Sequence, residues 1–248
     1  MAGEAPSIFV RKIGVIGYSI SDDMSVNRLT NPSSRTLRGM RDNVNSRMIK
    51  TIIFDMGKVI IPFDFQRGYD RMAPLCGYDA AQIPERLRSC DLVTRFEEGK
   101  LDPQEFVKEI SSILELNASY GEFCGIWSSI FLPDTLISEE FVLALRERHR
   151  LLLLSNTNAI HYEMVSKAYP LLGHFHHHVL SHKVGALKPS PIIYAEALKH
   201  SNAEPGECFF TDDIAAYVEG AKQAGIDAVQ FESQAQIERE LRARGVDW

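Results

Sequence analysis

Five polar side chains stand at or just beyond the ends of apolar segments in this sequence of 248 residues. They are Asp55, Ser155, Lys188, Asp212 and Asp213. A carboxylate in such a set can attack phosphorus and divide one difficult reaction into two easier steps through an aspartyl-phosphate. Because the attacking group and the phosphate are both anions, this chemistry requires Mg²⁺, which binds carboxylate and phosphate oxygens.

These residues separate into an attacking group, metal ligands and phosphate ligands. Asp55 is predicted to be the catalytic nucleophile, and Asp55, Asp213 and the carbonyl of Gly57 are predicted to hold Mg²⁺. Lys188 would place a fixed positive charge against the phosphoryl oxygens, and Ser155 would offer its hydroxyl and neighbouring amides. The sequence therefore favours phosphoryl transfer.

The apolar segments before these residues have the composition of buried strands in a parallel sheet. We expect strands at Thr51–Phe54, Leu151–Leu154, Val179–Ser181, Cys208–Thr211 and Ala228–Phe231. Helical patterns alternate with them, which predicts an α/β fold with a parallel sheet flanked by helices and right-handed crossovers. The carboxyl ends of such strands share one edge, where open α/β sheets bind their ligands.

About seventy residues between the first two strands have helical patterns, with a capping box and an N-terminal proline at Asp102–Glu105. This segment is too long for a single crossover, so it is predicted to form a small domain of its own. The predicted division is a hydrolase core of residues 48–63 and 138–248 and a helical cap of residues 64–137.

Residues 1–47 are polar and prone to turns, without a sustained helical or strand period. We expect a disordered N-terminal extension. Met48 directly precedes the first predicted strand, which makes it an alternative start of the chain.

The overall composition argues against several classes of partner. The net charge of −6 disfavours nucleic acid and anionic membranes, and no apolar run reaches the length of about 18 residues that spans a bilayer. The four cysteines form no C-x-x-C pair, as is usual in a reducing compartment. We expect a cytoplasmic protein, either a monomer or a homodimer, that acts on a small phosphorylated metabolite.

Four stretches resemble the motifs of the haloacid dehalogenase-like hydrolase superfamily: Phe54–Ile60, Leu154–Asn158, Leu187–Pro189 and Phe210–Asp213. The resemblance covers roughly residues 48–248. It is strongest to the branch that holds α-D-glucose-1-phosphate phosphatase and the N-terminal phosphatase domain of soluble epoxide hydrolase.

The resemblance implies a Rossmann-like core with the helical cap inserted after the first strand. It also implies phosphate binding by Ser155, Asn156 and Lys188, and Asp213 as a magnesium ligand with Asp212 beside it.

Two positions depart from the family pattern. Most phosphatases of the family carry a second Asp two residues after the nucleophile, as the general acid, and here that position is Gly57. Asp64 is a possible substitute, although a role in a turn is favoured. Tyr217 stands where Asn or Asp is common, and we expect it to pack.

The histidines His174 and His176–His178 resemble a metal cluster in sequence. Neighbours in an extended segment alternate between faces, so only His176 and His178 could converge, and a structural role is favoured.

The leading hypothesis is a magnesium-dependent phosphatase of a small metabolite, with sugar phosphates as a candidate class. One alternative, motivated by Gly57, is a catalytically weak binding or regulatory protein of the same ancestry. The other is a metal-independent haloacid dehalogenase, against which the Asp212–Asp213 pair argues. The sequence does not identify the physiological substrate.

Overall fold

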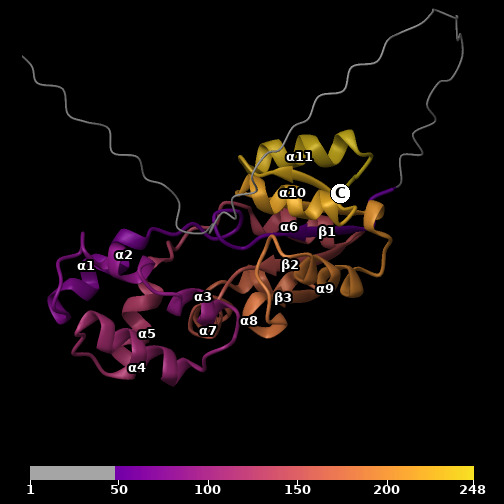
Figure 1. Ribbon diagram of the computed structural model, residues 1–248. Helices are drawn as coiled ribbons and strands as arrows, with labels where there is room; N and C mark the ends of the chain where they lie inside the picture. The colour runs from indigo at the N-terminus through magenta and orange to yellow at the C-terminus, as the bar shows by residue number, and fades with distance from the viewer. Residues whose placement is uncertain (1–47) are drawn as a thin grey trace, which may run out of the picture. The chain divides into compact units, whose positions relative to one another are not determined.

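The computed structural model describes residues 48–248, and the predictions made for residues 1–47 lie outside this range. Five parallel strands form one sheet with the order β3-β2-β1-β4-β5 (Figure 1). Their bounds are Thr51–Phe54 (β1), Arg150–Ser155 (β2), His177–Leu180 (β3), Cys208–Asp212 (β4) and Asp227–Gln230 (β5). The predicted α/β class with a parallel sheet is confirmed.

The register of the central strands brings the predicted catalytic side chains to one edge. Phe54 at the end of β1 pairs with Leu153 of β2 and Thr211 of β4. The amide of Asp55 then donates to the carbonyl of Thr211 at 3.0 Å. Asp55 and Asp212 therefore leave their strands side by side.

Helices cover both faces of the sheet, because successive strand residues point to opposite sides. Leu151 and Leu153 pack on the side covered by α6, α7 and α11, whereas Leu152 and Leu154 pack on the side covered by α9 and α10. The bounds of these helices are Glu139–Arg146 (α6), Ala159–Ala168 (α7), Pro191–Ser201 (α9), Ala215–Gln223 (α10) and Gln234–Ala243 (α11). The four-residue helix α8 spans Ser181–Val184.

Five further helices lie between β1 and β2 and form a cap with its own apolar core. They are Phe65–Met72 (α1), Ile83–Arg88 (α2), Leu92–Glu97 (α3), Pro103–Leu114 (α4) and Tyr120–Trp127 (α5). Phe106 is central to this core, because its ring stacks on Phe96 at 4.0 Å and meets Phe123 edge-on at 6.0 Å. The predicted capping box at Asp102 is present. A helical cap after the first strand is thus confirmed, while its exact limits remain a prediction.

Short 3₁₀ helices join the longer elements. They are Ala73–Leu75 (η1), Ser128–Ile130 (η2), Pro170–His174 (η3) and Pro205–Glu207 (η4).

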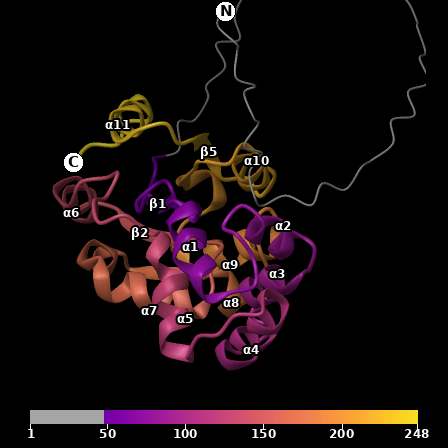
Figure 2. The same ribbon diagram turned by 90° about the vertical axis from the view of Figure 1, so that its left-hand side faces the viewer.

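The two chain segments that cross between core and cap are paired with each other. Pro62–Asp64 runs beside Ile130–Leu132, with two backbone hydrogen bonds of 2.9 Å and a β-bridge between Phe63 and Phe131. The rings of Phe63 and Phe131 also meet at a centroid distance of 6.2 Å. The cap helices lie at one end of the sheet in Figure 1 and face the viewer in Figure 2.

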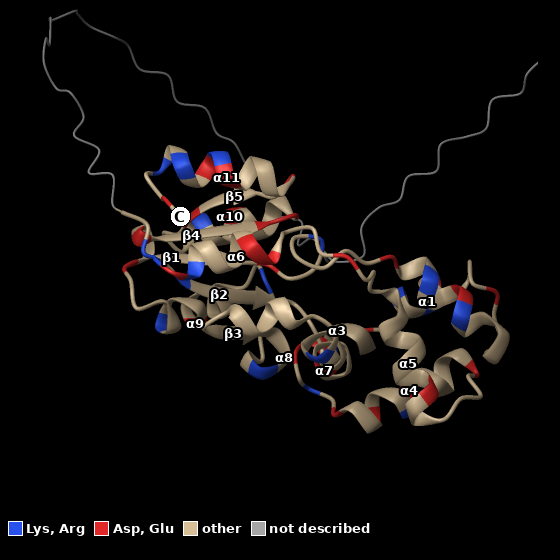
Figure 3. Cartoon of the chain, turned by 180° about the vertical axis from the view of Figure 1, so that it is seen from behind, with Lys and Arg blue, Asp and Glu red and all other residues tan. Residues whose placement is uncertain are grey.

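Charged residues lie mainly on helices, such as α1 and α11, and on loops, whereas most of the sheet consists of uncharged residues (Figure 3). Among the described residues, no helix combines the length and the apolar character needed to cross a bilayer.

His161 joins the core to the cap. Its Nδ1 accepts a hydrogen bond of 3.2 Å from the side chain of Asn158, and its Nε2 donates to the Trp127 carbonyl at 3.0 Å. The imidazole also stacks on the Trp127 ring. Burial lowers the pKa of His161 from 6.5 to about 4, against the opposing effect of the Trp127 carbonyl. The folded protein therefore keeps His161 neutral.

This burial predicts a pH-dependent contribution to stability. In the unfolded chain the imidazole gains its proton near pH 6.5, but in the folded chain only near pH 4. The contribution of neutral His161 is complete above pH 6.5 and falls by about 3 kcal/mol between these values. The difference in free energy of unfolding between wild type and His161→Gln should therefore narrow as pH decreases from 7 to 4. Urea denaturation at several pH values measures it, and a constant difference would contradict the prediction.

Candidate active site

Three carboxylates meet where β1 and β4 end. One oxygen from each of Asp55, Asp212 and Asp213 lies within 4.8 Å of the others. Asp55 is 7% exposed, Asp212 is fully buried and Asp213 is half-buried. Such a concentration of negative charge in a poorly solvated place requires a cation.

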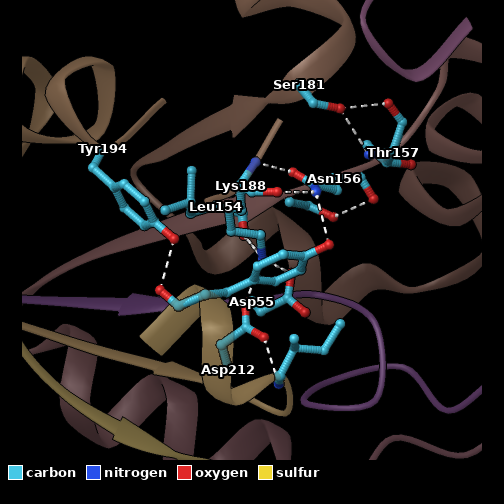
Figure 4. A network of polar contacts seen from close by, with 11 residues as sticks. Asp55, Leu154, Asn156, Thr157, Ser181, Lys188, Tyr194 and Asp212 are labelled. Atoms are coloured by element: carbon cyan, nitrogen blue, oxygen red, sulfur yellow. Dashed lines mark hydrogen bonds and ion pairs between the residues drawn. The ribbon is translucent and has the colours of Figure 1, made fainter. Parts of the chain in front are cut away.

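Lys188 supplies one positive charge to this acidic edge (Figure 4). Its Nζ lies 2.7 Å from Oδ1 of Asp55 and 2.5 Å from Oδ2 of Asp212, and it also donates to the Leu154 carbonyl at 3.1 Å. The side chain is almost wholly buried. All three protons of the ammonium group therefore have an acceptor.

The proximity of these groups perturbs their protonation. Burial raises the pKa of Asp55 to about 7, with a contribution from Asp212 and against the lowering effect of Lys188. Burial alone would lower the pKa of the Lys188 ammonium, but the Asp212 and Asp55 carboxylates raise it above its ordinary value. Lys188 is thus a permanent cation.

Asn156 fixes the segment that carries Lys188. Its Oδ1 accepts from the Lys188 amide at 2.8 Å, and its Nδ2 donates to the Lys188 carbonyl at 3.1 Å and to the Tyr217 hydroxyl at 3.3 Å. The Tyr217 ring lies 5.1 Å from Nζ of Lys188. Tyr217 packs as expected, but it also belongs to this polar network, which its position in the sequence did not indicate.

The loop after β2 is held by a second pair of hydrogen bonds. The Ser181 hydroxyl accepts from the Thr157 amide and donates to the Thr157 carbonyl, both at 2.9 Å. Ser155 is buried at the end of β2, and its hydroxyl makes a long contact of 3.5 Å with the Asn156 carbonyl. Ser155 and Asn156 stand at the predicted edge, and phosphate binding by them stays a prediction.

Gly57 has no room for a side chain in this conformation. A Cβ atom there would lie 2.8 Å from Cε1 of Phe63, closer than non-bonded carbon atoms approach. Asp64, the other candidate acid, is exposed and caps α1, since its Oδ1 accepts from the Gln66 amide at 2.9 Å. The favoured role of Asp64 in a turn thus agrees with the observed contacts.

The four histidines between residues 174 and 178 contact different groups. His174 bonds Glu139, His176 accepts from the Leu151 amide, His177 stacks on His200 and His178 bonds Tyr162.

The donor set at the acidic edge suits a hard divalent cation. Carboxylate oxygens are the ligands that Mg²⁺ prefers, and three of them converge here, from the buried Asp55 and Asp212 and the half-buried Asp213. Within residues 48–248, these aspartates are the group of three possible metal-ligating side chains that lies close enough to share one ion.

Comparison with known proteins places the chain in a family. The profile of the haloacid dehalogenase-like hydrolases matches residues 49–225. The chain belongs to this family. The match spans the three converging aspartates and Lys188, as the sequence motifs predicted, although the branch within the superfamily is not resolved by it.

Relatives of this hydrolase include enzymes with known activity. A D-ribitol-5-phosphate phosphatase from Bacteroides thetaiotaomicron is 30% identical over 200 residues, which cover 78% of this chain and 97% of the relative. A crystal structure of a haloacid dehalogenase family enzyme from the same organism, in complex with magnesium and inorganic phosphate, is 26% identical, with a TM-score of 0.69 over 75% of this chain and 96% of that one. The L-2-haloacid dehalogenase of Xanthobacter autotrophicus, at 20% identity, a TM-score of 0.54 and coverage of 79% and 83%, shares the fold alone.

The ion pairs of Lys188 predict a large loss of stability when they are removed. Lys188→Met leaves two buried carboxylates without their cation, so the free energy of unfolding should fall by about 3–5 kcal/mol. The control is Lys199→Met, which removes an exposed ion pair with Glu196 and should cost less than about 1 kcal/mol. Urea denaturation in metal-free buffer measures both, and equal losses would contradict the prediction.

The contact between Gly57 and Phe63 predicts that the two positions are energetically coupled. Gly57→Ala forces the Phe63 ring to move and should cost about 1–3 kcal/mol of stability, as overpacking does. The same change should cost less in a Phe63→Leu background, where the ring is absent. A double-mutant cycle measures this coupling, and additive losses would show that the contact is unimportant.

Proposed function

We propose that this hydrolase is a magnesium-dependent phosphatase of a small phosphorylated sugar or sugar alcohol, acting through an aspartyl-phosphate on Asp55. The observation that carries the proposal is the buried Lys188 ammonium between Asp55 and Asp212, with Asp213 at the same edge. This arrangement combines a nucleophile, a fixed positive charge and a place for a divalent cation in one site.

Asp55 is the proposed nucleophile because it directly follows the central strand β1 and, at 7% exposed, is not wholly closed off from solvent. Lys188, held beside it by Asn156, would contact the phosphoryl oxygens when substrate binds. Ser155, with a hydroxyl weakly engaged in the described structure, is the proposed phosphate ligand from β2.

Asp55, Asp213 and the Gly57 carbonyl are the proposed ligands of Mg²⁺. Both oxygens of Asp212 already accept hydrogen bonds, from the Ile214 amide at 2.8 Å and from Lys188 at 2.5 Å. Asp212 therefore suits a place beside the ion, holding Lys188, better than direct coordination. When bound, Mg²⁺ would neutralise charge between the carboxylates and the phosphate.

The comparisons support this proposal through the properties of the relatives. One relative is named as a phosphatase of D-ribitol 5-phosphate, and the Bacteroides enzyme was crystallised with magnesium and phosphate. The alternative of a haloacid dehalogenase is supported only by a similarity in fold to the Xanthobacter enzyme. The acidic group at the edge of the sheet favours the metal-dependent reaction.

A panel of sugar and sugar-alcohol phosphates tests the function. Wild type should release inorganic phosphate with Mg²⁺ and lose this activity with a chelator. Asp55→Asn removes the nucleophile and should reduce kcat by at least about 10⁴-fold, as loss of other nucleophiles does. The control Asp64→Asn makes the same chemical change at the exposed cap of α1 and should retain activity.

Two outcomes would reject the proposal. Activity that survives Asp55→Asn would exclude the aspartyl-phosphate route. Wild type without metal-dependent turnover on the whole panel would favour a binding or regulatory role instead.

A further inference from the structure

The proposed reaction leaves one chemical need unmet within the core. An alkoxide leaving group requires a proton, and a positioned acid typically contributes about 10²–10⁴-fold to the rate. Gly57 offers no side chain, the space next to it is filled by Phe63, and Asp64 is committed to capping α1. Lys188 is held as a cation by two carboxylates. The donor must therefore come from elsewhere.

The C-terminal end of α3 brings the cap against the catalytic edge. Helix α3 packs on α8, and Gly99 lies so close to it that a Cβ atom would be 2.0 Å from the His182 carbonyl. Gly99 has a positive φ of 68°, which favours glycine at this approach. His182 in turn donates from Nδ1 to the Thr157 carbonyl at 3.0 Å. The end of α3 is thus two contacts away from the loop that follows Ser155.

Glu97 is the last residue of α3, and its charge acts on Tyr217 of the catalytic network. The electrostatic influence of Glu97 contributes to the raised pKa of the Tyr217 hydroxyl, behind the larger effects of burial, Lys188, Asp212 and Asn156. The same hydroxyl accepts from Asn156, and the Tyr217 ring faces Lys188. Glu97 therefore belongs to the cap segment that contacts α8, two residues before Gly99, and its charge acts on Tyr217 of the catalytic network.

The Glu97 carboxyl has no structural partner among the described residues. It makes no hydrogen bond or ion pair within residues 48–248, whereas its neighbour Glu98 pairs with Lys100 at 2.5 Å. Glu97 is half-buried, and a carboxylate that is withdrawn from water without a partner is costly when charged. Burial accordingly raises the pKa of Glu97 to about 7, so the group can hold a proton near neutral pH.

Charged groups on the elements packed against α3 are engaged with other partners. Glu109 of α4 pairs with Arg95 at 3.5 Å, His182 of α8 bonds Thr157, and Lys183 of α8 lies over the Tyr162 ring. Among the described residues, no cation lowers the pKa of Glu97.

We propose that Glu97 is the general acid and base of this site, supplied by the cap in place of the acid missing at Gly57; the inference rests on the proposed phosphatase function. In the first step an Asp55 oxygen bonds to phosphorus while the bond to the leaving oxygen breaks, and that oxygen takes the proton of Glu97. In the second step the Glu97 carboxylate takes a proton from water as the water oxygen bonds to phosphorus. The bond between phosphorus and Asp55 then breaks, which restores both carboxyl groups and releases inorganic phosphate.

The test compares leaving groups in Glu97→Gln, a change that keeps the size of the side chain. With a sugar-alcohol phosphate, whose alkoxide needs the proton, kcat should fall by about 10²–10⁴-fold. With p-nitrophenyl phosphate, whose phenolate leaves without one, the first release of nitrophenolate should keep the wild-type rate. Later turnovers should be slow, because water still lacks its base. Rapid mixing should therefore show a burst of one nitrophenolate per protein and a trapped phosphoprotein.

The control is Glu98→Gln, at the residue that directly follows α3, which should behave as wild type with both substrates. Thermal unfolding of each variant shows whether the fold is retained. Wild-type kcat on the sugar-alcohol phosphate in Glu97→Gln would overturn the inference while the phosphatase function stands. An equal loss of the burst and of alkyl-phosphate turnover would also overturn it, by showing a structural role. Wild type without phosphatase activity would instead reject the function itself.

Discussion

The buried ammonium group of Lys188 is the contact on which the rest of the site depends. Two carboxylates from adjacent strands approach the same cation, which offsets the cost of burying their charges. The surroundings are arranged to keep Lys188 there, since Asn156 bonds both its amide and its carbonyl. The parallel register of β1 and β4 then sets the distance between the two acids.

The sheet and its edge were predictable because they depend on local patterns. Strands buried on both faces must be apolar throughout, so a polar residue at their end is conspicuous in the sequence. Asp55 and Asp212 could be placed at one edge without any knowledge of side-chain contacts, because parallel strands share their direction. The capping box at Asp102 was predictable for a similar reason, since its two hydrogen bonds join residues three positions apart.

The contacts that depend on tertiary packing could not be predicted in this way. Tyr217 joins the network through Asn156, which is 61 residues distant in the sequence, and neither residue type signals the pairing. Glu97 lies in the stretch Arg95–Gly99, which also resembles the family, but nothing in that stretch indicates an acid without a partner. Its character arises only from the side chains that enclose it and from the lack of a counterion, and both depend on how the cap rests on the core. Whether an acidic side chain has a partner in the folded protein cannot be inferred from the sequence alone.

The paired segments Pro62–Asp64 and Ile130–Leu132 have a mechanical consequence. The outgoing and returning chains are joined by two hydrogen bonds and a β-bridge, so the two covalent crossings between core and cap form one two-stranded connection. Such a connection resists sliding of one chain against the other. Changes in the cap helices can then alter which molecules are admitted while the strands and their aspartates stay in place.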